Sequence, residues 1–441
     1  MGSYVPSSAE ERQEMLKQIG KKSIDELFSH IPENVKLNRP LGIPNGLSEM
    51  EVCRKMEAIA AKNVVFKTLF RGAGAYNHYI PSAVKAIASK EEFVTAYTPY
   101  QAEISQGLLQ SIFEYQTMIC ELTGMDVSNA SVYDGATAAA EAALMCKDRG
   151  KSKVLLSATT NPQTIQVVQT YCEAAGMEIV LIPSRDGFIN MDALAQALDP
   201  SVACVYIQQP NYYGLIEDAA KIGEIAHSAS AKYIMGCNPI SLAILKSPGE
   251  CDADIAVGEG QPLGMKLAFG GPYLGFMACR ESMTRKLPGR IVGETVDTNG
   301  KRAYVLTLQA REQHIRREKA SSSICSNQAL CALTATVYMA TMGPDGMAEV
   351  ANQCYSKAQY AAEQIGQIAG FRLKYEGLFF NEFVTSCPVP YETVMAKLEE
   401  KGILGGYPLT DEKKGDILWC VTEVNTKAEI DELIRILREV A

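Results

Sequence analysis

Between residues 153 and 279, short runs rich in β-branched and other apolar residues alternate with segments of helical character. This alternation constrains the fold more than any other feature, because strands separated by covering helices build a mostly parallel sheet. The expected strands are Lys153–Ser157, Glu178–Pro183, Val202–Gln208, Tyr233–Cys237, Asp254–Gly258 and Tyr273–Cys279. The expected helices are Asn161–Ala175, Met191–Leu198 and Ala219–Ser228. The sequence therefore predicts an α/β fold with helices on both faces of a mostly parallel sheet.

The flanking regions predict two further parts. Residues 1–70 are expected to form a helical N-terminal arm, in which Ser48 caps a helix over 48–61 and Glu51 completes a capping box. A large α/β domain is expected over 71–325, and a smaller C-terminal α/β domain over 326–441. Further expected helices are Ile104–Gly124, Ala136–Arg149, Ser326–Ala369, Tyr391–Lys401 and Lys427–Val440, and further strands are Phe371–Tyr375, Glu382–Thr385 and Ile417–Val421.

Composition narrows the class of protein. Apolar residues make up 47% and charged residues 21% of the chain, which is typical of globular proteins and argues against disorder. The net charge of −9 argues against nucleic acid or an anionic membrane as the main partner. No apolar run reaches the roughly 18 residues of a membrane-spanning helix, and the polar N-terminus resembles neither a signal nor a transit peptide. A cytoplasmic protein is expected.

The cysteines and histidines predict no metal site. None of the thirteen cysteines forms a CxxC pair, and most stand in apolar stretches, so buried reduced thiols are expected. The four histidines, which show no metal-ligand spacing, are His30, His78, His227 and His314. Arg316 and Arg317 could bind a carboxylate, but their charged surroundings favour a surface or interface role.

Two polar, aromatic segments are candidates for ligand binding. The first, at 72–81, reads GAGAYNHYIP and places Tyr76, Asn77 and His78 in a glycine-rich loop. Its structural alternative is a packed connector. The second, at 98–107, reads TPYQAEISQG and places Thr98, Tyr100 and Gln101 where a helix begins, at an end that favours anions. Ordinary helix capping is the alternative there.

Two further glycine-containing segments follow. Tyr133, Asp134 and Thr137 stand where an alanine-rich helix opens, a common position for a phosphate, although the charge of Asp134 would oppose one. The segment VGEGQPLG at 257–264 leads to FGGP at 269–272. Close approach of the backbone to a ligand or partner, or plain turn chemistry, would explain its composition.

Together these four segments resemble the P-protein family of the glycine cleavage system, in order along nearly the whole chain. The chain has about half the length of a fused P-protein and is similar to the separately encoded subunit 1. The resemblance implies the type I fold of pyridoxal-phosphate-dependent transferases, with a doubly wound large domain. It also implies a reaction in which glycine joins pyridoxal phosphate, loses CO₂ and passes an aminomethyl group to the lipoyl arm of H-protein.

The resemblance also indicates that this chain lacks the cofactor lysine. In the lysine-bearing subunit the lysine precedes the proline of a Gly-Gly-Pro turn by eleven residues, and the equivalent position before Pro272 is Gln261. An amide cannot form an imine. Asn238 stands where related subunits have an acid beside the pyridine nitrogen. Lys266, five residues beyond Gln261, is a poor substitute.

Three hypotheses follow. In the favoured one, this chain completes the active site of a lysine-bearing partner in an α₂β₂ assembly, with pyridoxal phosphate held by the partner and no covalent catalytic residue here. Tyr76, Asn77, His78, Thr98, Tyr100 and Gln101 then line the site, and Tyr133, Asp134 and Thr137 mark a vestigial phosphate cup. The alternatives are a self-sufficient decarboxylase or aminotransferase using Lys266, and a non-catalytic scaffold that docks H-protein.

Overall fold

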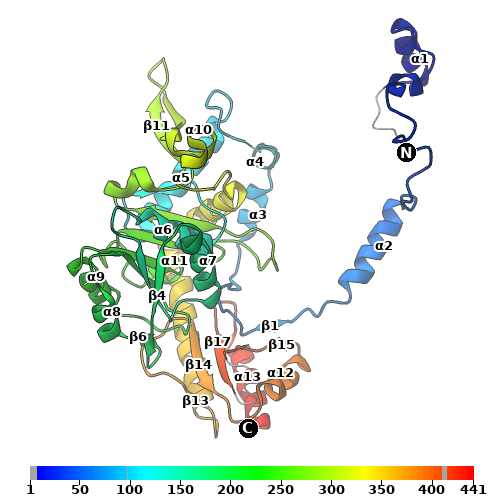
Figure 1. Cartoon of the computed structure of the whole chain (residues 1–441). Helices are drawn as coiled ribbons and strands as arrows, with labels where there is room; N and C mark the ends of the chain where they lie inside the picture. Colours follow the sequence, from blue (N-terminus) through cyan, green and yellow to red (C-terminus); the bar gives the residue numbers. More distant parts are fainter. Residues whose placement is uncertain (1–6, 97, 410–414) are drawn as a thin grey trace. The chain divides into compact units, whose positions relative to one another are not determined.

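The computed structural model describes residues 7–96, 98–409 and 415–441 (Figure 1). The chain divides into two compact units, Met1–Val64 and Val65–Ala441. In the part that the structure describes, none of the helices has both the length and the hydropathy that crossing a bilayer requires.

The first unit consists of short helices with hardly any core. Its elements are α1 (Ala9–Gln18), the 3₁₀ helix η1 (Asp25–Phe28) and α2 (Glu49–Ala60). The capping box predicted for Ser48 and Glu51 is confirmed, since the Ser48 N–H donates to Glu51 Oε2 at 2.9 Å and the Glu51 N–H to Ser48 Oγ at 3.4 Å. Leu16 is buried in α1, whereas α2 buries none of its residues. Local capping is therefore the main support of these helices.

A seven-stranded sheet forms the centre of the second unit. Its strand order is β2-β10-β9-β8-β7-β3-β4, and the pairs among β9, β8, β7, β3 and β4 are parallel. Strand β10 runs antiparallel to β9 and β2. The strands are β2 (Val127–Ser128), β3 (Lys153–Ser157), β4 (Glu178–Ile182), β7 (Val202–Gln209), β8 (Lys232–Cys237), β9 (Ile255–Glu259) and β10 (Gly275–Cys279).

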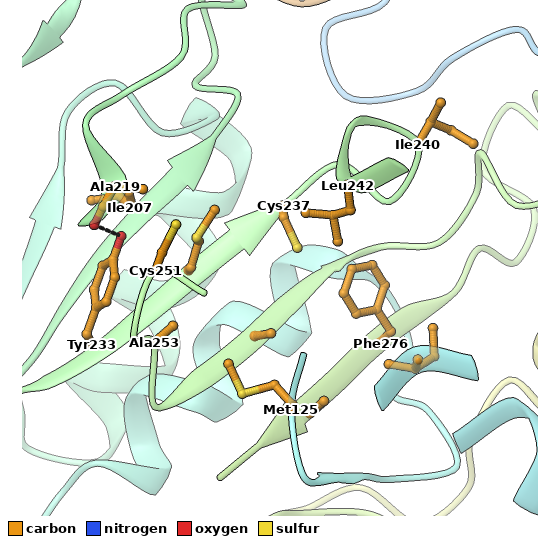
Figure 2. Close-up of a cluster of buried hydrophobic side chains, with 14 of the residues drawn as sticks. Met125, Ile207, Ala219, Tyr233, Cys237, Ile240, Leu242, Cys251, Ala253 and Phe276 are labelled. Carbon is orange, nitrogen blue, oxygen red and sulfur yellow. Dashed lines mark hydrogen bonds between the residues drawn. The ribbon is translucent and has the colours of Figure 1, made fainter. Parts of the chain in front are cut away.

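Both faces of this sheet are buried, because alternate residues of one strand enter different hydrophobic clusters. On β7, Val205 and Ile207 belong to one cluster, whereas Cys204 and Tyr206 belong to the other. Figure 2 shows part of the first cluster, where the Tyr233 hydroxyl donates to the Ala219 carbonyl at 2.9 Å. The helices of the large domain are α3 (Ser82–Ala88), α4 (Glu91–Val94), α5 (Gln106–Thr123), α6 (Gly135–Met145), α7 (Pro162–Ala174), α8 (Met191–Ala197) and α9 (Ala219–Ser228). The predicted α/β class is confirmed.

The C-terminal part builds a second, antiparallel sheet in the order β13-β14-β17-β16. It packs with helices around its own apolar cluster, which includes the fully buried Trp419. The strands are β13 (Arg372–Leu373), β14 (Glu382–Ser386), β16 (Tyr407–Pro408) and β17 (Asp416–Cys420), and the helices are α11 (Ala329–Gly366), α12 (Tyr391–Glu399) and α13 (Lys427–Val440). Helix α11 contributes to this cluster and to the large-domain core, with a break at Gly343 followed by Pro344.

Smaller pairings complete the unit. Strand β1 (Thr68–Leu69) pairs in parallel with β15 (Ile403–Leu404). The short hairpin β5 (Ser184–Arg185) with β6 (Phe188–Ile189) and the longer hairpin β11 (Ile291–Val296) with β12 (Arg302–Thr307) were not predicted. The remaining short helices are η2 (Ser241–Ala243), η3 (Glu281–Lys286), η4 (Gln309–Arg311), α10 (Gln313–Arg316) and η5 (Arg317–Lys319).

Two predicted helix boundaries differ clearly from the structure. The helix expected to end at Arg149 ends at Met145, with Cys146 as its C-cap. The helix expected to begin at Ile104 begins at Gln106, and the side chain of Ile104 is 79% exposed. The apolar spacing of Ile104 and Leu108 suggested a longer helix. A turn over 102–104 ends the irregular segment before α5, and the first buried apolar side chain of the helix is Leu109.

Gly214 tests how closely the loop after β7 packs against β14. Its φ is +84°, and a Cβ there would lie 1.9 Å from the Glu382 carbonyl oxygen. Gly214→Ala should therefore lower the free energy of unfolding by at least about 2 kcal/mol, from backbone strain and overlap together. Gly402 is the matched control, since its φ is +71° with nothing within 4 Å of the added Cβ. Gly402→Ala should cost only about 1 kcal/mol. Equal losses in urea denaturation would contradict the predicted overlap.

Candidate functional site

A cavity of about 330 Å³ lies where three neighbouring parallel strands end. Gln208 near the end of β7, Asn238 after β8 and Glu259 at the end of β9 line it. Its other walls come from the loop at 72–76 and from the start of α6 at 134–136. Ligands of open α/β sheets bind at the carboxyl ends of the strands, so this cavity is the candidate site.

The side-chain amide of Gln261 holds the first loop beside this cavity. Its Oε1 accepts from the Tyr76 N–H, and its Nε2 donates to the Tyr76 carbonyl, both at 2.8 Å. The same Nε2 donates to the Met265 carbonyl at 2.8 Å. Gln261 is fully buried. The amide therefore satisfies both backbone groups of Tyr76 and ties the loop at 72–81 to the segment that follows Gln261.

Carboxylates from the C-terminal domain hold the rest of that loop. Glu382 accepts from the Ala73 N–H at 2.6 Å and from the Tyr76 hydroxyl at 2.7 Å. Glu423 accepts from the Tyr79 N–H at 2.6 Å and lies 2.7 Å from His78 Nδ1. The loop is therefore fixed along most of its length by long-range contacts, and its conformation is preorganised.

The start of α6 is satisfied by this chain's own carboxylates. Glu259 Oε2 accepts from the Gly135 N–H at 3.0 Å, and Asp134 Oδ1 accepts from the Thr137 N–H at 2.8 Å. Glu259 Oε1 also accepts from the N–H groups of Gln261 and Leu274, each at 3.0 Å. Because an anion is favoured at a helix N-terminus, the partly buried Glu259 occupies the position that a phosphate would need.

Comparisons with known proteins agree with this architecture along the full chain. The family model described as "Glycine cleavage system P-protein" matches residues 2–437. A relative from Desulforamulus reducens is 52% identical over 98% of both chains, and one from Desulfitobacterium hafniense is 50% identical over 99% of this chain and all of its own. Both are described as probable glycine dehydrogenase (decarboxylating) subunit 1.

The chain belongs to the glycine cleavage system P-protein family. A crystal structure of a glycine decarboxylase (P-protein) in inhibitor-bound form has a TM-score of 0.92 and 40% identity, with complete coverage of both chains. An alanine–glyoxylate aminotransferase from Nostoc sp. has a TM-score of 0.60 and 16% identity, over 92% of this chain and 98% of its own. The predicted type I fold of pyridoxal-phosphate-dependent transferases is therefore confirmed.

Pyridoxal phosphate, the cofactor of this fold, does not fit the residues of this P-protein chain. A covalent link to the cofactor needs a lysine. The side-chain amide of Gln261 instead makes three hydrogen bonds to backbone groups. Glu259 and Asp134 would repel the phosphate at the start of α6. Asn238, in the expected place of an acid, accepts the Ile240 N–H at 2.9 Å and cannot carry a negative charge. Lys266 is exposed and is not among the described residues that line the cavity.

The predicted lining residues of the P-protein chain fall into different places. Tyr76 reaches the cavity but is 9% exposed and bound to Glu382. His78 is buried against Glu423, and Cys354 Sγ lies 3.4 Å from the same carboxylate. The ligand atoms of these three groups lie within 4.8 Å of one another, but Glu423 already pairs with His78 and Tyr79. Asn77, half-buried, accepts from the Thr422 hydroxyl through its main-chain carbonyl at 2.7 Å.

The residues of the second predicted segment do not meet the first at this cavity. Tyr100 lines a separate cavity of about 300 Å³ between α5 and the start of α11, and the Arg290 guanidinium lies 3.7 Å from the centre of its ring. Thr98 and Gln101 are exposed. Tyr133 lies outside the 330 Å³ cavity, where its hydroxyl accepts from the Cys325 N–H at 3.4 Å. The Thr137 hydroxyl donates to Asp134 at 3.1 Å.

Sequence reasoning missed the three carboxylates that organise the site. Glu259 stands two residues before Gln261, so its place in that glycine-rich segment could have marked it. Glu382 and Glu423 are more than 300 residues from the loop that they hold. Neither carries a local motif, because their partners are main-chain N–H groups brought near by the packing of the C-terminal domain.

Glu382 should make the stability of this chain depend on pH. Burial raises the pKa of its carboxyl from 4.5 to about 7, so the folded state favours the protonated form. The contribution of Glu382 to the free energy of unfolding is therefore fully present below about pH 4.5. It is lost as pH rises through about 7. The loss corresponds to about 3 kcal/mol.

Glu382→Gln should abolish that part of the dependence. Its Oε1 can still accept from Ala73, and its Nε2 can donate to the Tyr76 hydroxyl. Urea denaturation at several pH values should show the wild type losing stability relative to the variant between about pH 4.5 and 7. Parallel stability curves would contradict the raised pKa. Burial also raises the pKa values of Glu141 and Glu259 to about 7. Their contributions to the pH dependence are present in both proteins, so they cancel when the variant is compared with the wild type at each pH.

Proposed function

We propose that this chain acts as subunit 1 of a glycine dehydrogenase (decarboxylating), the P-protein of the glycine cleavage system. It works with a lysine-bearing subunit 2, which holds pyridoxal phosphate, and its substrates are glycine and the lipoyl arm of H-protein. The observation that carries the proposal is the buried Gln261 at the lysine position, which is fully engaged with backbone groups. The chain retains the fold of the family without its cofactor chemistry.

The relatives' names support a partner, since each is described as subunit 1. Enzymes of this fold commonly place active sites between subunits. An α₂β₂ heterotetramer would bring the loop at 72–81 of this chain close to the partner's pocket. In that arrangement Tyr76, Asn77 and His78, with Thr98, Tyr100 and Gln101, orient substrate and exclude water, without covalent catalysis.

The contacts indicate two different roles for these residues. Tyr76 and His78 are buried and bonded to carboxylates, so they act by setting the shape of the loop. Asn77, Thr98 and Gln101 are the residues of the predicted set that are accessible in this chain, together with the partly exposed Tyr100. Direct contact with substrate is therefore assigned to these four residues. Tyr76 and His78 hold the loop at 72–81 in its conformation.

The first test asks which subunit forms an aldimine. This chain, its lysine-bearing subunit and their mixture are incubated with pyridoxal phosphate, reduced with borohydride and mapped by peptide mass spectrometry. The label is expected on the partner's lysine and not on this chain, because neither Gln261 nor the exposed Lys266 can form the internal aldimine of this cavity. Lys266→Ala is the matched control and should leave the result unchanged. A label on Lys266 that disappears in this variant would support the self-sufficient enzyme instead.

The second test separates a site-lining role from a scaffold. Asn77→Ala should leave assembly with the partner intact and lower glycine decarboxylation by the complex at least about tenfold, because a positioned polar group is lost. Gln163→Ala is the control, since Gln163 borders the 330 Å³ cavity of this chain and comes from the start of α7. Unchanged turnover for Asn77→Ala, Thr98→Ala and Gln101→Ala would favour a scaffold that docks H-protein.

A further inference from the structure

Gln261 joins two loops whose tips carry exposed aromatic side chains. The first loop contains Tyr76, bound through its N–H and carbonyl, and ends near Tyr79. The second begins at Met265, whose carbonyl accepts from the same amide, and its tip is Phe269. Tyr79 is 65% exposed and Phe269 is 96% exposed. One buried side chain therefore bonds to both of the loops that carry these aromatic groups, while Glu423 holds the Tyr79 N–H directly.

The second loop has an unusual conformation at its tip. Phe269 has a φ of +48°, which is disfavoured for a bulky residue, and Gly270 follows with a φ of +98°. The loop is closed by the Gly271 N–H, which donates to the Ala268 carbonyl at 3.0 Å, and by the Ala268 N–H, which donates to the Tyr273 hydroxyl at 3.3 Å. A strained, closed turn thus holds an aromatic ring in solvent.

Both loops border the candidate site. Tyr76 from the first and Tyr273 from the end of the second line the same cavity. The pocket that they border lacks the lysine that the family reaction needs, so its chemistry has to come from another chain. The exposed tips are therefore continuous with the surface that the proposed function assigns to subunit 2.

We infer that Tyr79 and Phe269 are anchors of the interface with the lysine-bearing subunit, and that Gln261 is the positioning residue that presents them. Aromatic side chains on fixed backbone are strong interface anchors, because they bury a large area and lose little conformational freedom on binding. The position that holds the lysine in the catalytic subunit would here serve assembly. This inference rests on the proposed function, because that function supplies the partner.

The test measures association of this full-length chain with the lysine-bearing subunit by sedimentation and surface plasmon resonance. Phe269→Ala and Tyr79→Ala are each expected to weaken association at least about tenfold without changing the circular dichroism of the free chain. Leu181→Ala and Leu378→Ala are the controls, because these side chains are 43% and 67% exposed elsewhere in the second unit. They should leave association unchanged.

Gln261→Met tests the positioning role. It preserves length and removes the three hydrogen bonds, so association should weaken and the Tyr76 amide should exchange with deuterium faster. Gln116→Met is the matched control. Gln116 is also buried and holds both backbone groups of Val292 at 2.9 Å, away from the two loops. A structural loss common to both variants would lower stability in each, but only Gln261→Met should weaken association.

The outcomes separate this inference from the function on which it depends. If the wild-type chain does not associate with the lysine-bearing subunit, the proposed function fails. If the wild type associates and both Phe269→Ala and Tyr79→Ala bind like the wild type, the anchor assignment is overturned while the function stands. If those two variants weaken binding but Gln261→Met and Gln116→Met behave alike, the positioning role of Gln261 is overturned.

Discussion

The hydrogen bonds of the Gln261 amide determine much of the candidate site, because they connect elements that no local pattern would bring together. A primary amide suits this position chemically. Its oxygen accepts the Tyr76 N–H while its nitrogen donates to two carbonyls. A lysine ammonium could donate to the carbonyls but could not accept from Tyr76, which would leave a buried N–H without that partner. A lysine at this position could therefore not make the same bridge between the loops.

The buried Glu382 and the partly buried Glu259 and Glu423 complete this arrangement. Glu259 stabilises the start of α6, while Glu382 and Glu423 reach from the C-terminal domain to the loop at 72–81. Each accepts main-chain N–H groups, which is how a buried carboxylate recovers part of the hydration that it loses. The candidate cavity is thus bordered by the chain's own carboxylates, and Glu259 takes the place of an anion at the start of α6.

The sequence predicted the large elements well and the directions of individual side chains poorly. Helix and strand periodicity located the alternating elements from β3 to β10 and the final helix, since burial on two sheet faces leaves long apolar runs. The hairpin of β11 and β12 was missed because it follows no clear alternation. Tyr76 and His78 were predicted to line the active site, and in this chain their side chains bond to Glu382 and Glu423. Tyr100 belongs to a different cavity, where it stacks against Arg290.

The sequence by itself determined the α/β class and the family, and it predicted Gln261 at the cofactor-lysine position, because these depend on residue type, spacing and order along the chain. Only the tertiary structure decided which partners Gln261 and Glu259 bind. Gln261 pairs with Tyr76 across 185 residues, and Glu259 meets Gly135 across 124. A sequence states which donors and acceptors a chain possesses, but their pairing depends on how distant elements pack, since a buried polar group bonds with whichever partner the fold brings within about 3 Å.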